Sequence, residues 1–144
     1  MAASRTTLTE GISRLEDQPG VEFQEDHTIA QFCGDWVSTN QSTRGIAKIK
    51  IRTKENGLSV NAFGAAEPAL SDWGIATAEV FTDGASSPRI RSFRAFYDFG
   101  FMETHLQAKT EKGVLVIASF NRFKDQSGRS SYFSREFFSR EAVD

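Results

Sequence analysis

The sequence has one cysteine, two histidines and three prolines among its 144 residues. A single cysteine cannot form an intrachain disulfide, so the fold cannot depend on a disulfide framework. Two histidines and Cys33 are too few for the four nitrogen or sulfur ligands of a structural zinc site, and we expect no bound metal. No glycine-rich phosphate loop with a Gly-Lys-Ser or Gly-Lys-Thr ending occurs, and we expect no cofactor.

Long apolar runs and a large charge of either sign are also missing. No stretch approaches the roughly 20 apolar residues that a membrane-spanning helix needs, so we expect no membrane partner. The 17 basic and 19 acidic side chains give a net charge of −2, which argues against an electrostatic grip on nucleic acid or anionic lipid. The N-terminal residues mix acids with bases and have no apolar core, unlike a secretory signal. With neither signal nor disulfide, we expect a cytoplasmic protein.

Residues 1–30 differ in pattern from the rest, and we expect them to be a lead-in segment before a single domain at 31–144. Thr7 and Glu10 have the spacing of a capping box, in which the Thr hydroxyl accepts from a helical N–H and the Glu reaches back. Leu8, Ile12 and Leu15 fall on one helical face. The pattern predicts a short amphipathic helix that packs on the body of the protein.

From Gly34 onward the apolar residues follow a period of two, which is typical of strands with one buried face. Ile49 and Ile51, for example, alternate with basic residues. Eight such segments, the first at Trp36, are joined mostly by short turns, which favour antiparallel neighbours. Eight strands in a meander can close on themselves and leave no exposed edge. We therefore predict an all-β fold, an eight-stranded antiparallel up-and-down β-barrel with a short N-terminal helix.

A glycine and a tryptophan open the first strand, in the sequence Gly34-Asp35-Trp36. A lead-in helix, Gly-x-Trp and eight meandering strands resemble the calycin group of β-barrels, which includes lipocalins, fatty-acid-binding proteins and avidin-like proteins. The resemblance implies that Trp36 closes one end of the barrel and that an arginine of the last strand, Arg135 or Arg140, lies over its ring. The second lipocalin motif and the Arg-x-Tyr pair of many fatty-acid-binding proteins are absent, so lipid carboxylate transport is not implied.

Two side chains are candidates for acid–base chemistry. Glu79 is the one charge on a face that also carries Trp73 and Phe81, whereas the opposite face of that strand is small and apolar. If the Trp73 face points inward, Glu79 is a buried carboxylate with a raised pKa, and if the apolar face does, Glu79 lies outside. His105 shares a polar face with Glu103, and the two form an acid–base pair in the cavity only if that face points inward. Both choices stay open at this point.

The candidate ligand contacts follow from the size of the barrel, because core and pocket wall are the same surface in a small barrel. Trp73 is the first of them, since it stands beside a loop bounded by glycine and proline, where an open rim would lie. Arg122 either caps a pocket or leaves the barrel at its rim. The predicted contacts are Trp73, Phe93, Tyr97, Arg122 and Tyr132.

The predicted function is to bind one small, largely apolar molecule in the barrel cavity. A first alternative is a cofactor-independent cyclase or isomerase for a substrate of the secondary-metabolite type, which encloses that substrate in a dry pocket beside one or two acids. A second alternative is a protein–protein interaction module with a filled barrel and exposed rings. A cavity of roughly a few hundred cubic ångströms would favour a ligand. The oligomeric state is open, with a homodimer among the alternatives.

Overall fold

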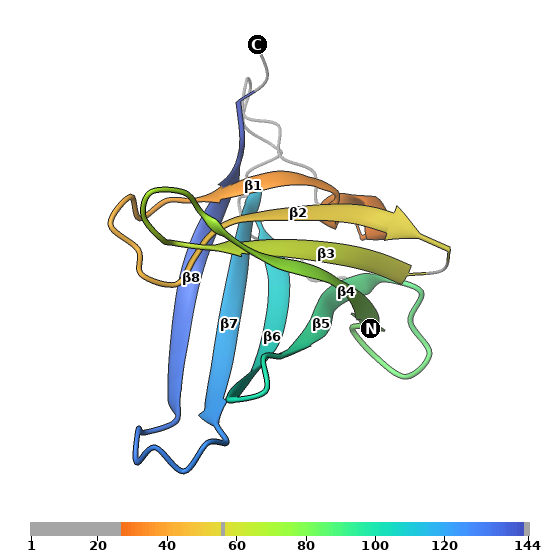
Figure 1. The fold of residues 1–144 in the computed structure, drawn as a ribbon. Helices are drawn as coiled ribbons and strands as arrows, with labels where there is room; N and C mark the ends of the chain where they lie inside the picture. The colour runs from red at the N-terminus through yellow and green to blue at the C-terminus, as the bar shows by residue number, and fades with distance from the viewer. Residues whose placement is uncertain (1–26, 56, 143–144) are drawn as a thin grey trace, which may run out of the picture.

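A computed structural model describes residues 27–55 and 57–142 of the chain. Each of its eight strands pairs antiparallel with the next, and the last pairs back with the first, so the predicted all-β barrel is confirmed (Figure 1). A short 3₁₀ helix, η2 (Ile29–Phe32), precedes the first strand, and the predicted helix near Leu8 lies outside the described residues. The strands are β1 (Gly34–Ser38), β2 (Ile46–Lys54), β3 (Gly57–Gly64), β4 (Ser71–Thr82), β5 (Ile90–Asp98), β6 (Met102–Glu111), β7 (Val114–Phe123) and β8 (Tyr132–Arg140).

The alternation of apolar and polar residues places one face of each strand inside the barrel. Ile49 and Ile51 of β2, Leu58 of β3, Leu106 of β6 and Leu115 of β7 are all fully buried. In Figure 1, β1 to β3 run across the view and β6 to β8 run down it, so the interior is enclosed by two groups of strands that cross steeply. The core therefore lies between these two groups.

The barrel closes where β1 meets β8. Trp36 pairs in register with Arg140, and the guanidinium carbon of Arg140 lies 4.4 Å from the centroid of the Trp36 ring. Arg140 also donates hydrogen bonds to the carbonyl groups of Gln31 and Cys33, at 3.0 and 3.1 Å. The fully buried indole of Trp36 donates to the carbonyl group of Phe32 at 2.9 Å. Of the two candidate arginines, Arg140 is the one that covers Trp36.

The end of the barrel near Trp36 is filled with side chains. Phe32 and Phe93 meet edge to face with ring centroids 5.1 Å apart, and both rings are buried. This arrangement is favourable for aromatic pairs and leaves no gap between the rings. Phe93, one of the predicted ligand contacts, therefore belongs to the packed end of the barrel.

An irregularity in β4 changes which of its side chains face inward. The pairing of β3 with β4 shifts between Asn61 and Phe63, where three steps along β4 oppose two along β3. The extra residue forms a β-bulge, and Gly74 within it has a φ of +88°, a region that favours glycine. The bulge turns Trp73 toward the core, whereas Glu79 is exposed. The prediction that Trp73 and Glu79 share a face is wrong, because an inserted residue reverses the alternation.

We expect Arg140→Ala to lower the free energy of unfolding by roughly 2 kcal/mol, because it removes a cation–π contact and the donor to two carbonyl groups. Arg135→Ala is the matched control. The Arg135 guanidinium lies on the outer face of β8, over the ring of the exposed Phe137. Its loss should cost less than about 0.5 kcal/mol. Urea unfolding followed by circular dichroism measures both, and equal losses would contradict the role given to Arg140.

Candidate functional site

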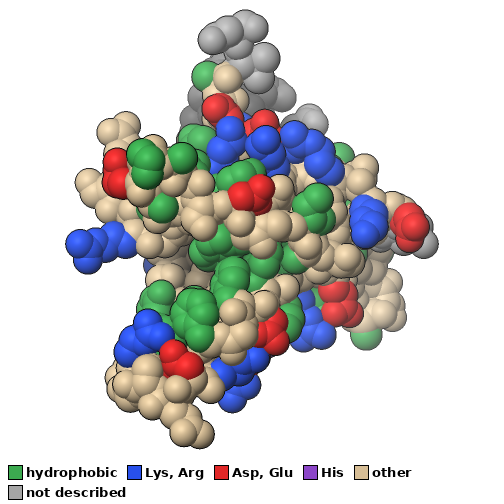
Figure 2. Space-filling model, viewed as in Figure 1, with side chains coloured by type: hydrophobic (Ala, Val, Ile, Leu, Met, Phe, Trp, Pro, Cys, Tyr) green, Lys and Arg blue, Asp and Glu red, His purple; other side chains and the backbone are tan. Residues whose placement is uncertain are grey.

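Toward the end opposite Trp36, the barrel interior holds a cavity of about 370 Å³. Its lining comes from β2, β4, β6, β7, β8 and the loop between β1 and β2, so segments far apart in the sequence meet there. Ile46, Trp73, Ile117 and Phe138 supply apolar surface. Figure 2 shows the hydrophobic side chains of one face gathered near its centre, with Lys, Arg, Asp and Glu side chains around them.

One wall of the cavity is polar. Ser119 and Asn121 of β7 and Ser134 and Glu136 of β8 all line it. They alternate along their strands with outward residues, and Ser119 lies directly opposite Ser134 in the pairing of β7 with β8. The hydroxyl group of the buried Thr104 donates to Oδ1 of Asn121 at 2.8 Å, which fixes the Asn121 amide. Hydroxyl, amide and carboxylate groups thus follow one side of the cavity.

The Glu136 carboxylate is held by the loop between β1 and β2. Its Oε2 accepts a hydrogen bond from the Thr43 hydroxyl at 2.6 Å. A Cβ at residue 45 would lie 3.1 Å from this oxygen, so Gly45 leaves room for the carboxylate. Its Oε1 is buried and is the one buried side-chain oxygen or nitrogen without a hydrogen-bond partner among the described residues. Burying a carboxylate oxygen without a donor is costly, which makes the Glu136 carboxylate a candidate ligand contact.

Trp73 forms part of the apolar wall. Its indole lies against Gly64, where a Cβ would be only 2.7 Å from Nε1, so residue 64 has to be glycine for Trp73 to lie there. The rings of Tyr97 and Phe99 pack edge-on against it, with centroids at 5.5 and 5.2 Å. The Tyr97 hydroxyl donates to the carbonyl group of Gly74 at 2.8 Å, and burial raises the pKa of this phenol. Tyr97 therefore pins the bulge that turns Trp73 inward.

Two of the five predicted ligand contacts line the cavity. Trp73 and Tyr132 do so, and Tyr132 is exposed at the rim. Tyr97 is buried behind Trp73, and Phe93 lies at the packed end. Arg122 projects from the outer face of β7, with its side chain 67% exposed. Phe93 and Tyr97 face inward as expected, but their depth along the barrel keeps them away from the cavity.

Both predicted acid–base side chains lie outside the barrel. Glu79 is exposed and forms an ion pair with Arg94, at 3.0 Å between Oε1 and Nη2. His105 is exposed, with its ring centroid 4.6 Å from that of Phe96. The two line one outer groove of about 430 Å³ formed by β4, β5 and β6. The small apolar face is thus the inward one on β4, and the structure places neither Glu79 nor His105 in the cavity.

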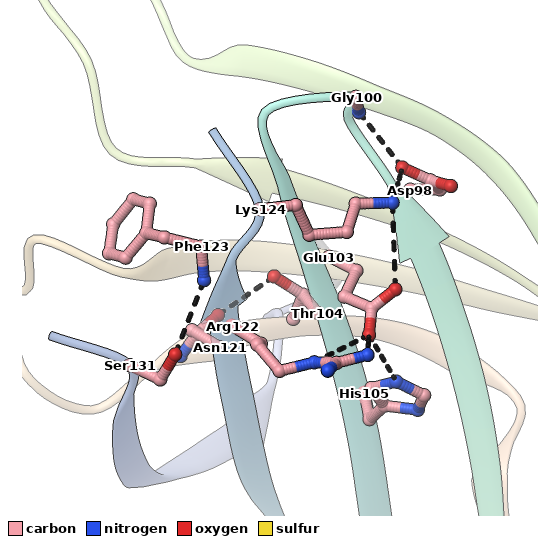
Figure 3. Close-up of polar contacts among 10 residues, drawn as sticks. All are labelled: Asp98, Gly100, Glu103, Thr104, His105, Asn121, Arg122, Phe123, Lys124 and Ser131. Atoms are coloured by element: carbon pink, nitrogen blue, oxygen red, sulfur yellow. Dashed lines mark hydrogen bonds and ion pairs between the residues drawn. The ribbon is translucent and has the colours of Figure 1, made fainter. Parts of the chain in front are cut away.

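Glu103 is the centre of a charged network on the outer face, shown in Figure 3. Its carboxylate is only 10% exposed and accepts a hydrogen bond from Nε of Arg122 at 2.9 Å. Lys124 lies 3.6 Å from its second oxygen and 3.0 Å from Asp98, and His105 lies 3.6 Å from its first oxygen. The hydrogen bond from Arg122, together with the nearby charges, holds the pKa of Glu103 below its ordinary value. The network ties β5, β6 and β7 together.

The lowered pKa of Glu103 gives its contribution to stability a defined pH dependence. A carboxyl group with a lower pKa in the folded state stabilises the fold fully above its unfolded pKa, here about 4.5, and loses this effect as the pH falls through the folded value. We expect Glu103→Gln to lower the urea midpoint at pH 7, and the difference from wild type to shrink below about pH 4.5. Glu79→Gln, at an exposed pair, should change the midpoint little. A Glu103→Gln deficit that is the same at pH 7 and pH 3 would contradict this reasoning.

The polar wall contains residues that the sequence analysis did not select, above all Glu136, Ser119 and Ser134. The sequence does contain a signal for Glu136. Once Arg140 is the arginine that covers Trp36, every second residue back along β8 shares its face, and Glu136 must point inward. Ser119 carries no comparable signal, because a serine suits either face of a strand.

Comparisons with protein-family models, with curated proteins and with solved structures find no match. Among the described residues, no group of three or more His, Cys, Asp and Glu side chains could hold a metal ion. In the same part of the chain, no helix is both long enough and apolar enough to span a bilayer.

Proposed function

We propose that this protein binds one small amphipathic molecule in the barrel cavity. The observation that carries the proposal is the cavity itself, about 370 Å³ inside a closed barrel whose other end is packed. Small-molecule sites have volumes of roughly 300–1,000 Å³ and combine apolar walls with a few polar groups. Trp73 offers a flat apolar surface, and Ser119 and Ser134 offer hydroxyl groups. The ligand that fits has an apolar face and a polar edge, rather than being apolar throughout.

The resemblance to calycins supports the same proposal. A closed eight-stranded meander has an interior just wide enough for side chains or one small ligand, as in lipocalins and streptavidin. From this topology, and from the pairing of Trp36 with Arg140, we infer that the chain is calycin-like. The fold by itself does not specify a ligand. A cytoplasmic location stays a prediction from the sequence.

The alternative of a cyclase or isomerase needs an acid or base inside the cavity. Glu79 and His105 do not line the cavity, whereas Glu136 does. The enzymatic alternative therefore depends on Glu136 as a general acid or base. Binding ranks ahead of it, because a single carboxylate without a second acid–base group is a sparse set for such chemistry.

A larger side chain inside the cavity should weaken ligand binding. The probe is N-phenyl-1-naphthylamine, a neutral dye whose fluorescence rises in apolar surroundings. We expect wild type to bind it and Ser119→Leu to bind it at least about tenfold more weakly, because the larger side chain occupies the cavity. Ala118→Leu is the matched control, since residue 118 is the next position on β7 and faces outward. It should bind as wild type does.

Native mass spectrometry of the purified protein is the complementary measurement. A small molecule that stays bound to wild type and to Ala118→Leu, but not to Ser119→Leu, would support the proposal and reveal the ligand's mass. Equal dye binding by all three proteins would place the dye outside the cavity and contradict the proposal.

A second candidate function, self-association, is favoured by the outer face of β4 to β8. Phe96, His105, Phe120 and Phe133 form one row across β5 to β8, because each pairs with the next in register. The three phenylalanines are each 43–56% exposed. Contiguous exposed apolar surface of this kind marks interaction sites. This observation favours a protein–protein contact that does not require a filled barrel.

The same face is complementary to itself. Consider a dimer whose twofold axis runs parallel to β6, between the outer faces of the two copies. In it, β4 of one copy lies over β8 of the other, β5 lies over β7, and residues at the same height along the strands face each other. This dimer would set Glu79 against Arg135 of the second copy, and Phe96 against Phe120 of the second copy. Arg135 forms no ion pair with a described residue, so an acid from a second copy would supply one. We therefore choose a homodimer over an unrelated partner.

Sedimentation equilibrium tests the homodimer. We expect a species of twice the 16.0 kDa chain mass at about 100 μM protein, and monomer for Phe120→Lys, which places a charge in the centre of the contact. Leu70→Lys is the control, because Leu70 is 45% exposed, close to the 43% of Phe120, and lies in the loop between β3 and β4, outside this face. Wild type that sediments as a monomer at this concentration, or dimerisation unaffected by Phe120→Lys, would contradict the assignment.

A further inference from the structure

The cavity contains one group that restricts the chemistry of its ligand. Glu136 lines the cavity, its Oε2 is bound by Thr43, and its buried Oε1 has no hydrogen-bond donor among the described residues. We propose that the ligand carries a protonated amine that pairs with the Glu136 carboxylate, attached to a flat apolar body that packs on Trp73. This inference rests on the proposed function and names the class of ligand.

An ammonium group meets the requirements of this wall better than a neutral donor does. Any donor to a carboxylate makes a charge-assisted hydrogen bond, but an ammonium group adds the attraction between opposite charges and brings three N–H donors. One donor satisfies Glu136. Ser134, two residues earlier on the same face of β8, and Ser119, opposite Ser134 on β7, supply hydroxyl acceptors for the others. A hydroxyl group on the ligand would bring a single donor and no charge.

The apolar part of the ligand would pack on the wall opposite Glu136. Trp73 lies on β4, and in an eight-stranded barrel β4 is four strands away from β8, so the indole faces the polar wall across the interior. Ile117 and Phe138 complete the apolar lining near Glu136. A ligand with an aromatic or alicyclic body and an amine on a short arm could place the body on Trp73 and the amine at the polar wall.

Charge at the rim does not reverse the preference for a cation. Arg44 is the other charged side chain of the lining, and it is exposed. Water and salt screen an exposed charge, whereas the interaction with a buried charge is stronger because the surroundings have a lower dielectric constant. A cation beside the Glu136 carboxylate is therefore attracted more strongly than Arg44 repels it.

Three probes of the same size test the proposal. Tryptamine, tryptophol and 3-propylindole share an indole and a three-atom arm, and they end in an ammonium, a hydroxyl and a methyl group. Titration followed by ¹H–¹⁵N NMR, with the indole N–H of Trp73 as the reporter, gives the three dissociation constants. We expect tryptamine to bind at least about tenfold more tightly than tryptophol, and 3-propylindole to bind no more tightly than tryptophol.

Two substitutions assign the preference to its residue. Glu136→Gln keeps the shape of the side chain and an oxygen for Thr43, and it should weaken tryptamine binding at least about tenfold while changing tryptophol binding less than about threefold. Glu103→Gln removes a carboxylate from the outer face and should leave all three constants unchanged. Because the wild-type series is decisive without any variant, the test does not depend on the folding of Glu136→Gln.

The possible outcomes distinguish a failure of the amine class from a failure of small-molecule binding in the cavity. Three probes that bind wild type within threefold of one another, or a preference for tryptamine that survives in Glu136→Gln, would overturn the amine class and leave the cavity as a binding site. If Ser119→Leu does not weaken dye binding and no probe shifts the Trp73 signal, both the amine class and the cavity as a binding site are overturned.

Discussion

The contact of Arg140 with Trp36 is the interaction on which the rest of this barrel depends. It closes β8 against β1, and it also sets which face of β8 points inward. Because side chains alternate along a strand, an inward Arg140 brings Phe138, Glu136 and Ser134 inside with it. The same contact that stabilises the closed end therefore delivers a carboxylate to the cavity. Had Arg135 covered Trp36, the inner surface of β8 would consist of Phe133, Arg135 and Phe137.

The interior is divided along its length. Near Trp36 the inward side chains are mostly large and apolar, and they are buried against one another. Further along, β7 and β8 present Ser119, Asn121 and Ser134, which are too small or too polar to pack there. A cavity exists because the filling side chains end part-way along the barrel, and the bulge at Gly74 then sets Trp73 across the remaining space. The strands β7 and β8 carry this wall on one face and exposed aromatic rings on the other, so a ligand and a partner would not compete for the same surface.

Much of the fold could be predicted because its signals are local. The period-two pattern gives eight strands, the short turns make neighbours antiparallel, and Gly34 and Trp36 mark the first strand and its closing contact. The site was less predictable. Trp73 and Tyr132 are predicted as ligand contacts and both line the cavity. Glu79 and Trp73, in contrast, are predicted on one face, because a bulge leaves no clear mark in the alternation. Phe93 faces inward as expected, yet it lies at the packed end, and periodicity contains no information about depth.

The sequence by itself determined that the chain would form a closed antiparallel barrel, because alternation and turns are properties of neighbouring residues. That Trp36 caps one end followed from the resemblance to calycins. Only the tertiary structure decided where the cavity lies and which groups line it. The position of a side chain along the barrel axis depends on the register between strands, and the unpaired oxygen of Glu136 depends on how Thr43 and Gly45, about 90 residues earlier, pack against it. Such distances are set by the pairing of all eight strands at once.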